Sequence, residues 1–190
     1  MRTRQPSPPR RRPPSSRPAG RDKPVPAIEI RLVGGLRAHR GELRSGQEKG
    51  TEVHAGSFLR RREIVLDSAL LARPPEMLRI LTHELYHFVW LRLGNAARRS
   101  YEDLVVGECR GGMRGELGWS SQWRKDALSL RDRTQRTRRW REYVCESFCD
   151  TASWLIGGTG RHPEYTLERP ARERRRAWFL SRKELERISV

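Results

Sequence analysis

Long hydrophobic runs are missing from this chain of 190 residues, and no apolar stretch reaches the roughly 18 residues of a membrane-spanning helix. No short apolar segment follows the arginines near the N-terminus, so we expect no secretory signal peptide. Cysteine is scarce: the chain has three, an odd number without the spacing of a disulfide framework, which favours a reducing compartment. These absences predict a cytoplasmic protein without a membrane span.

Lysine is also rare, at four positions, and arginine supplies the rest of the 40 basic residues that give a formal net charge of +17. Residues 1–24 are rich in Pro, Arg and Ser and lack periodicity. A segment of this composition cannot bury enough apolar surface to fold. We therefore predict a disordered tail over residues 1–24 and one domain over residues 25–190. The charge predicts weak, non-specific and salt-sensitive binding of nucleic acid through the Arg-rich segments.

The most informative stretch is HELYH at residues 83–87, which lies among apolar residues at helical spacing. Positions four apart stack on one face of a helix, so His83 and His87 can direct two imidazoles at one zinc ion. Glu84 then lies beside the metal, where a general base takes a proton from zinc-bound water. The pattern favours a zinc-dependent hydrolase over two ordinary helix histidines beside an exposed glutamate.

A catalytic zinc needs a third protein ligand. The extended pattern H-E-x-x-H-x-x-G-x-x-H is excluded, because Trp90 and Leu93 stand where it requires Gly and His. Downstream, Glu142, Glu146 and Asp150 fall at steps of four on one face of a second predicted helix. Acids at this spacing repel one another on a bare helix, so a facing cation or neighbouring arginines must offset the repulsion.

The pair of segments HELYH and CESFCD resembles the gluzincin metallopeptidases of the thermolysin-like clan, in which H-E-x-x-H is followed by a helix with E-x-x-x-D. The resemblance covers these two helices of the chain. It implies that His83, His87 and Glu146 bind Zn²⁺ and that Glu84 is the general base. It also implies that Asp150 accepts the second ring N–H of His83 and so orients that ring.

Three residues of the second helix leave alternatives open. Cys145 and Cys149 stand where the family usually has Asn and Ser, which weakens assignment to a subfamily. We interpret both as small buried apolar side chains, with zinc ligation or redox control as alternatives. Glu142 is the alternative third ligand, in which case Glu146 would lie behind it.

The predicted fold class is α+β and zincin-like, with a small N-terminal β-sheet followed by a mostly helical region that holds the active-site helix and the second ligand helix. The resemblance implies that the strand at residues 63–67 binds an extended peptide by strand addition, and an ordinary sheet strand is the alternative. The other predicted elements are a strand near 28–32, an exposed loop at 40–50, the metal helix from Pro74 to Gly94, helices starting near Ser100 and Ser120, a helix at roughly 135–156, and a C-terminal helix from Pro170.

Peptide-bond hydrolysis of a peptide or protein substrate is the leading functional hypothesis. The alternative is an Arg-rich, nucleic-acid-associated protein whose zinc site is structural or regulatory. A peptidase recruited to nucleic acid, as in SprT-like proteins, would use a third histidine, for which His162 is the candidate. The side chains that spacing alone does not place are Glu108, Glu116, Tyr165 and the arginines of residues 131–141, which are either solvated or bind phosphate or substrate carboxylates.

Overall fold

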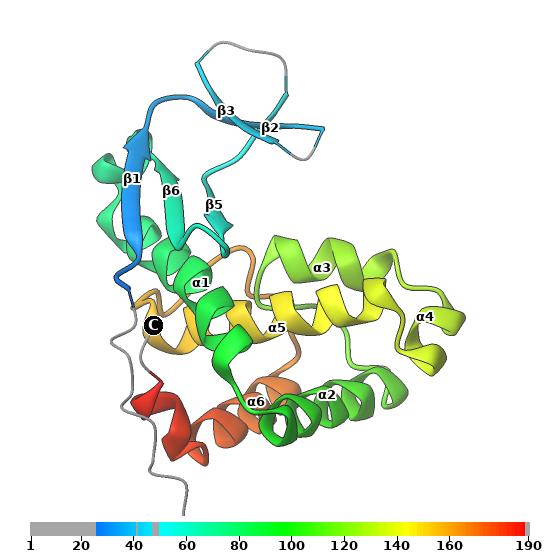
Figure 1. The fold of residues 1–190 in the computed structure, drawn as a ribbon. Coiled ribbons are helices and arrows are strands. Elements are labelled where there is room, and N and C mark those ends of the chain that lie inside the picture. Colours follow the sequence, from blue (N-terminus) through cyan, green and yellow to red (C-terminus); the bar gives the residue numbers. More distant parts are fainter. Residues whose placement is uncertain (1–25, 41, 47–49, 189–190) are drawn as a thin grey trace, which may run out of the picture.

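The computed structural model describes residues 26–40, 42–46 and 50–188, and the predicted tail over residues 1–24 lies outside these ranges. Strands form the N-terminal part and helices the remainder, so the α+β prediction is confirmed (Figure 1). The elements are, in chain order, β1 (Glu29–Val33), β2 (Leu36–His39), β3 (Glu42–Ser45), β4 (Thr51–Glu52), β5 (Ala55–Phe58), β6 (Glu63–Asp67), the 3-10 helix η1 (Ser68–Ala72), α1 (Pro74–Arg92), α2 (Asn95–Arg110), α3 (Trp119–Asp126), α4 (Leu130–Gln135), α5 (Arg138–Ile156), α6 (Arg169–Leu180) and the 3-10 helix η2 (Lys183–Arg187).

The strands form two small sheets, with the orders β1-β6-β5 and β3-β2-β4. In the first sheet, β6 pairs in parallel with β1 and antiparallel with β5. Every residue of β6 is buried, as its aliphatic sequence favours for a central strand. The loop predicted at residues 40–50 is wrong in part, because β3 lies there and pairs with β2. Leu43 of β3 packs where Gly56 of β5 has no side chain.

Helix α1 links the first sheet to the helical part of the molecule (Figure 1). It begins at Pro74 as predicted, with Glu76 in the first turn, where the positive end of the helix favours an acid. Ile80 and Phe88 belong to the apolar core beneath β6, whereas Val89 belongs to a second core shared with α5. Because α1 has apolar residues on both sides, its intermediate faces carry the polar side chains of the HELYH segment.

Helix α5 is the centre of the helical part, and α2, α3, α4 and α6 all pack against it. Tyr101 of α2 is fully buried, with its ring edge-on to Phe148 of α5 at 5.4 Å and to Trp178 of α6 at 5.0 Å. The helix predicted at roughly 135–156 is confirmed as α5, and Arg136, which adopts a left-handed conformation with φ of 48°, separates it from the short helix α4. Thus α4 ends before this residue and α5 begins after it.

The helix predicted to start near Ser100 begins earlier, at Asn95. The Ser100 hydroxyl does not cap a helix; it accepts hydrogen bonds from Trp178 Nε1 at 3.0 Å and Arg182 Nη2 at 2.7 Å, and so joins α2 to the C-terminal segment.

Among the described residues, no helix is both long and apolar enough to cross a membrane.

Candidate metal centre

His83 and His87 lie one turn apart on α1, and their rings are 5.0 Å apart at an angle of 77°. Both direct Nε2 toward Glu146 of α5: the Glu146 Oε2 atom lies 3.3 Å from His83 Nε2 and 4.0 Å from His87 Nε2. All three donor atoms lie within 4.8 Å of one another. Ligands of a tetrahedral zinc are separated by about 3.3–3.5 Å when metal–ligand bonds are 2.0–2.2 Å long, so these side chains fit a zinc ion after a small inward movement.

Asp150 lies one turn after Glu146, and its Oδ1 is 2.7 Å from His83 Nδ1. This is the place of the carboxylate that orients a metal-bound histidine. The other oxygen of Asp150 accepts from the Ser121 backbone N–H at 3.2 Å. The backbone approaches so closely that a Cβ added to Gly118 would lie 2.3 Å from the Asp150 carboxylate. Glycine is therefore required before α3.

The electrostatics of the centre favour an ionised Glu146. Burial opposes its ionisation, but hydrogen bonding from His83 and the nearby positive charges of His87, His83 and Arg124 lower the pKa of Glu146 to about 2. Burial likewise opposes protonation of His83, yet the Asp150 and Glu146 carboxylates raise the pKa of this histidine well above its ordinary value. The carboxylates of Glu146 and Asp150 therefore favour a positive charge on the group that lies between them.

Two residues of α3 touch Glu146 from the solvent side. The Ser120 hydroxyl donates to Oε2 at 2.8 Å, and Arg124 Nη2 lies 3.1 Å from Oε1. Sequence spacing gave no signal for these contacts, because α3 comes from the segment between the two ligand helices. This segment therefore packs directly against the candidate third ligand.

Glu84 is buried beside the two histidines. Its Oε2 accepts a short hydrogen bond from the Ser57 hydroxyl of β5, which also donates to the Glu84 carbonyl at 3.2 Å. Burial opposes protonation of His87, but the hydrogen bond with Cys145 and the nearby Glu146 and Glu84 carboxylates raise its pKa. Ser57 is a residue that the sequence did not point to, since no spacing relates it to HELYH.

The peptide-binding strand predicted at residues 63–67 is wrong, because β6 is paired on both sides. The outer strand on this side of the sheet is β5. Residues in an antiparallel ladder point alternately toward and away from the partner, and Asp67 N–H donates to the His54 carbonyl at 2.8 Å. The backbone groups of Ala55 and Ser57 therefore point away from β6, and the Ser57 hydroxyl contacts Glu84.

The alternative ligands lie elsewhere. Glu142 is half exposed and pairs with Arg138 at 2.7 Å. His162 lies 3.2 Å from Glu76 at the start of α1, and its ring is 5.4 Å from that of Tyr165. Glu76, His162 and Glu164 do form a second group of potential metal donors, but the Arg79 guanidinium pairs with both of its carboxylates. Neither Glu142 nor His162 joins the group of His83, His87 and Glu146.

Cys145 and Cys149 lie on the far side of His87. Their sulfurs are 3.6 Å and 3.5 Å from His87 Nδ1, whereas His87 Nε2 faces Glu146. Hydrogen bonding from Cys149 outweighs burial and, together with His87, lowers the pKa of Cys145 to about 6. Burial raises the pKa of Cys149 well above its ordinary value.

Glu108 and Glu116, which the sequence left unplaced, belong to the core of the helical part. Arg175 of α6 is fully buried and pairs with Glu108 at 2.7 Å and Glu116 at 2.8 Å. Tyr143 also donates to Glu116 at 2.5 Å, and Lys125 lies 3.2 Å from it. The group is saturated by partners within the chain.

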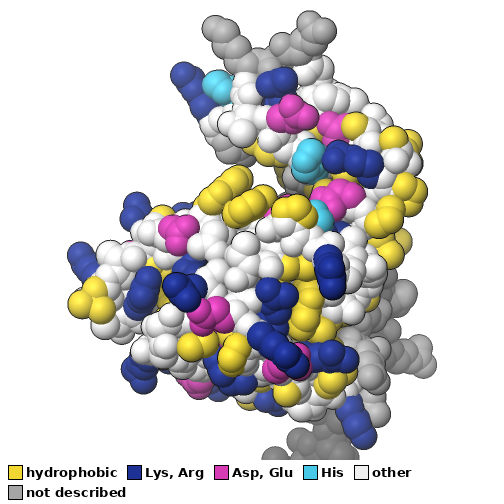
Figure 2. Space-filling model, turned by 180° about the vertical axis from the view of Figure 1, so that it is seen from behind, with side chains coloured by type: hydrophobic (Ala, Val, Ile, Leu, Met, Phe, Trp, Pro, Cys, Tyr) yellow, Lys and Arg dark blue, Asp and Glu magenta, His cyan; other side chains and the backbone are white. Residues whose placement is uncertain are grey.

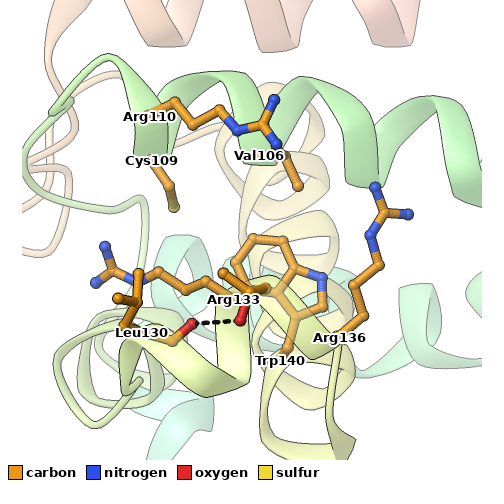
Figure 3. A pocket seen from close by; sticks show the side chains of 8 residues that line it. Val106, Cys109, Arg110, Leu130, Arg133, Arg136 and Trp140 are labelled. Atoms are coloured by element: carbon orange, nitrogen blue, oxygen red, sulfur yellow. Dashed lines mark hydrogen bonds between the residues drawn. The ribbon is translucent and has the colours of Figure 1, made fainter.

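The space-filling view shows a hollow between the N-terminal strands and the helices (Figure 2). Away from the metal centre, a cavity of about 460 Å³ opens between α2 and α4 beside the buried Trp140 (Figure 3). Arg110, Arg133 and Arg136 line it. Arg136 is paired with Glu102 and Asp103. Among the described residues, Arg110 and Arg133 pair with no carboxylate, so the predicted arginine run is divided between paired and unpaired side chains.

Comparison with known proteins adds no relative: no family model, no curated protein and no solved structure matches this chain.

Proposed function

We propose that this chain is a zinc-dependent peptidase with a zincin-like fold over residues 25–190, similar to the gluzincins. The observation that carries the proposal is the approach of Glu146 Oε2 to His83 Nε2 at 3.3 Å and to His87 Nε2 at 4.0 Å, with all three donor atoms within 4.8 Å of one another. Asp150 behind His83 and the buried Glu84 beside the histidines supply the two further groups that such a centre needs.

When bound by these three side chains, zinc supplies a Lewis acid that favours ionisation of a water and polarises a carbonyl. Glu84 takes the proton of the attacking water and passes it to the leaving amine. Ser57 holds the Glu84 carboxylate before substrate enters. Asp150 fixes the His83 ring, so that Nε2 and not Nδ1 faces the metal position.

The outward backbone groups of Ala55 and Ser57 give the substrate a place to pair as an added strand. Strand addition recognises the peptide backbone rather than particular side chains, so the substrate class is an extended peptide or an unfolded stretch of protein. The same strand carries the hydroxyl that contacts Glu84, which supports a position of the scissile bond near the base.

The test of the metal site is zinc content, measured on the wild type beside His83→Ala, Glu146→Ala and the matched control Glu142→Ala. We expect about one zinc per chain in the wild type and the control, and loss of zinc in the other two. Retention of zinc by Glu146→Ala would contradict the ligand set.

The test of the reaction is Glu84→Gln. This variant should keep its zinc but lose hydrolysis of a peptide library by a factor of at least about 100, because it has no base. Hydrolysis near the wild-type rate would refute the assigned role of Glu84.

A second candidate function is favoured by the unpaired Arg110 and Arg133 beside the cavity of Figure 3. We propose that these arginines bind nucleic acid phosphates weakly, independently of the metal. Replacing both by Gln should weaken binding of a single-stranded oligonucleotide and reduce its salt dependence. Arg138→Gln, which removes an arginine already paired with Glu142, is the control and should change binding less.

A further inference from the structure

The feature not used by the proposed reaction is the pair of cysteines behind His87. Cys145 and Cys149 lie one turn apart on α5, and their sulfurs approach the same nitrogen, Nδ1 of His87, at 3.6 Å and 3.5 Å. The three donor atoms lie within 4.8 Å of one another. They form a compact set of two thiols and one imidazole from two different helices.

These distances match metal coordination. With metal–sulfur bonds of about 2.3 Å and metal–nitrogen bonds of about 2.0–2.1 Å, ligand angles of about 110–120° separate the nitrogen from each sulfur by about 3.5–3.8 Å, a range that includes three-coordinate sites. Hydrogen bonding explains the two short S···N distances less fully. The Nδ1 atom of an imidazole either donates its single hydrogen or accepts a single hydrogen bond, so it cannot form a full hydrogen bond with both sulfurs. Two sulfurs at equal distance from it suit a metal that binds all three atoms.

The surroundings select the kind of metal. Thiolate sulfur prefers soft ions such as Cu(I) to hard ones such as Mg²⁺. Cys149 is fully buried and Cys145 partly so, and the neighbouring Tyr86 and Phe148 rings are 5.8 Å apart in the adjoining core. Such a closed, apolar site has little room for water ligands, which suits an ion that accepts low coordination numbers.

We propose that Cys145 Sγ, Cys149 Sγ and His87 Nδ1 form a second metal site, for a soft monovalent ion, Cu(I). His87 is shared: Nε2 belongs to the proposed zinc site and Nδ1 to the soft-metal site, so the ring bridges the two as an imidazolate, after its N–H proton has passed to solvent. Only this bridge rests on the proposed function. The two thiols and Nδ1 are a donor set whether or not the neighbouring centre is catalytic.

The experiment uses the full chain, reduced, loaded with zinc and kept without oxygen. Cu(I) is added in competition with the chromogenic chelator bathocuproine disulfonate, and bound copper and zinc are both counted. We expect the wild type to take one Cu(I) per chain and keep its zinc. Cys145→Ala and Cys149→Ala should each bind Cu(I) about 100-fold more weakly or worse. Cys109→Ser, which removes the third cysteine, is the matched control and should bind as the wild type does.

X-ray absorption of the copper-loaded wild type provides a readout that does not depend on variants folding, and two sulfurs and one nitrogen around copper are expected. The site is refuted if the wild type takes no Cu(I) from the chelator, or if the Cys145→Ala and Cys149→Ala variants bind it as well as the wild type. The bridge is refuted if Cu(I) expels zinc. Cu(I) bound by the cysteines in a chain that never holds zinc would instead refute the proposed peptidase and leave the cysteine site standing.

Discussion

Two groups of buried carboxylates lie along α5, and they are neutralised in different ways. Glu108 and Glu116 surround the guanidinium of Arg175, and all three side chains are at most 1% exposed. At the candidate metal centre, Glu146 and Asp150 face His83, and the side chains of Glu146 and His83 are each 13% exposed. In the first group, the chain itself supplies a permanent cation, Arg175. In the second group, the carboxylates face histidine rings, which can be neutral or protonated.

The difference distinguishes structural from functional acid clusters. A buried charge is tolerated only when it is paired and hydrogen-bonded. Arg175 donates to both glutamates, so that cluster needs nothing from outside. Arg124 reaches one oxygen of Glu146 from a partly exposed position, and the other oxygen faces the two Nε2 atoms. An external cation, such as the proposed zinc, would complete the second cluster and would be superfluous in the first.

The largest effect should come from breaking the closed cluster. Arg175→Met leaves Glu108 and Glu116 buried without their main cation and should lower the free energy of unfolding by about 3–5 kcal/mol. Urea denaturation measures it. Glu146→Gln, on the metal-free protein, should cost less, because the side chains of Glu146 and His83 are partly exposed. Equal losses in the two variants would contradict the distinction between the clusters.

A smaller effect is expected from Gly118→Ala. The added methyl meets the Asp150 carboxylate and must displace it or the start of α3, so the contact between Asp150 and His83 is disturbed. Loss of such an orienting carboxylate weakens zinc affinity by about 10–100-fold. Competition with a zinc chelator measures this, and Gly107→Ala is the control, because nothing lies within 4 Å of a Cβ there. Unchanged affinity in Gly118→Ala would show that Asp150 does not orient the ligand.

The closed cluster should also make stability depend on pH. Burial raises the pKa of Glu116, but Arg175 and its other partners outweigh burial and lower it below the ordinary value. The Glu116 carboxylate therefore binds a proton less tightly in the folded chain than in the unfolded chain. Glu116 therefore stabilises the fold above its ordinary pKa, and this contribution is lost as pH falls through the lowered value.

Replacing Glu108, Glu116 and Arg175 together by Leu, Leu and Met tests this dependence. The triple variant should be nearly as stable as the wild type at neutral pH. In acid unfolding followed by circular dichroism, its stability should fall less between neutral pH and pH values below the ordinary carboxyl range. An identical acid response would show that the cluster does not carry the effect.

The smallest effect is expected for Arg124→Gln. The Arg124 side chain is 39% exposed, and exposed ion pairs contribute at most about 1 kcal/mol. Removing its charge frees an oxygen of Glu146 and removes repulsion of a cation, so zinc affinity should rise by less than about tenfold. Calorimetric zinc titration measures this, with Arg138→Gln as a control on an arginine outside the centre. Weaker zinc binding would mean that Arg124 positions Glu146 rather than competing for it.

Local features of the fold were predicted well from the sequence. Helix α1 follows from apolar periodicity and prolines at its start, and the approach of His83 to His87 follows from helix geometry alone. Whether Glu142 or Glu146 faces the histidines is a different problem, because both occupy one face of α5. The packing of α1 on α5 decides it, and that long-range contact has no signature in spacing.

The same limit explains the other differences. Glu108 and Glu116 looked like candidate site residues because their partner, Arg175, is 67 and 59 residues away. Ser57 gave no signal, since a hydroxyl in a strand is common and its contact with Glu84 depends on how β5 lies over α1. Zinc binding and peptide hydrolysis are predictions, and each assigns a defined chemical role to named side chains.

The path of the chain between the two ligand helices has a consequence for folding. His87 and Cys145 are 58 residues apart, and α2, α3 and α4 lie between them. A metal held by both helices closes this long loop in the same way as a covalent cross-link, and closure of a long loop restricts the unfolded chain more than closure of a short one. Binding to the folded state alone adds RT ln(1 + [L]/Kd) to stability, so the melting temperature would rise with the concentration of free zinc if the proposed site binds it. The metal-free chain would lack this cross-link and unfold at a lower temperature.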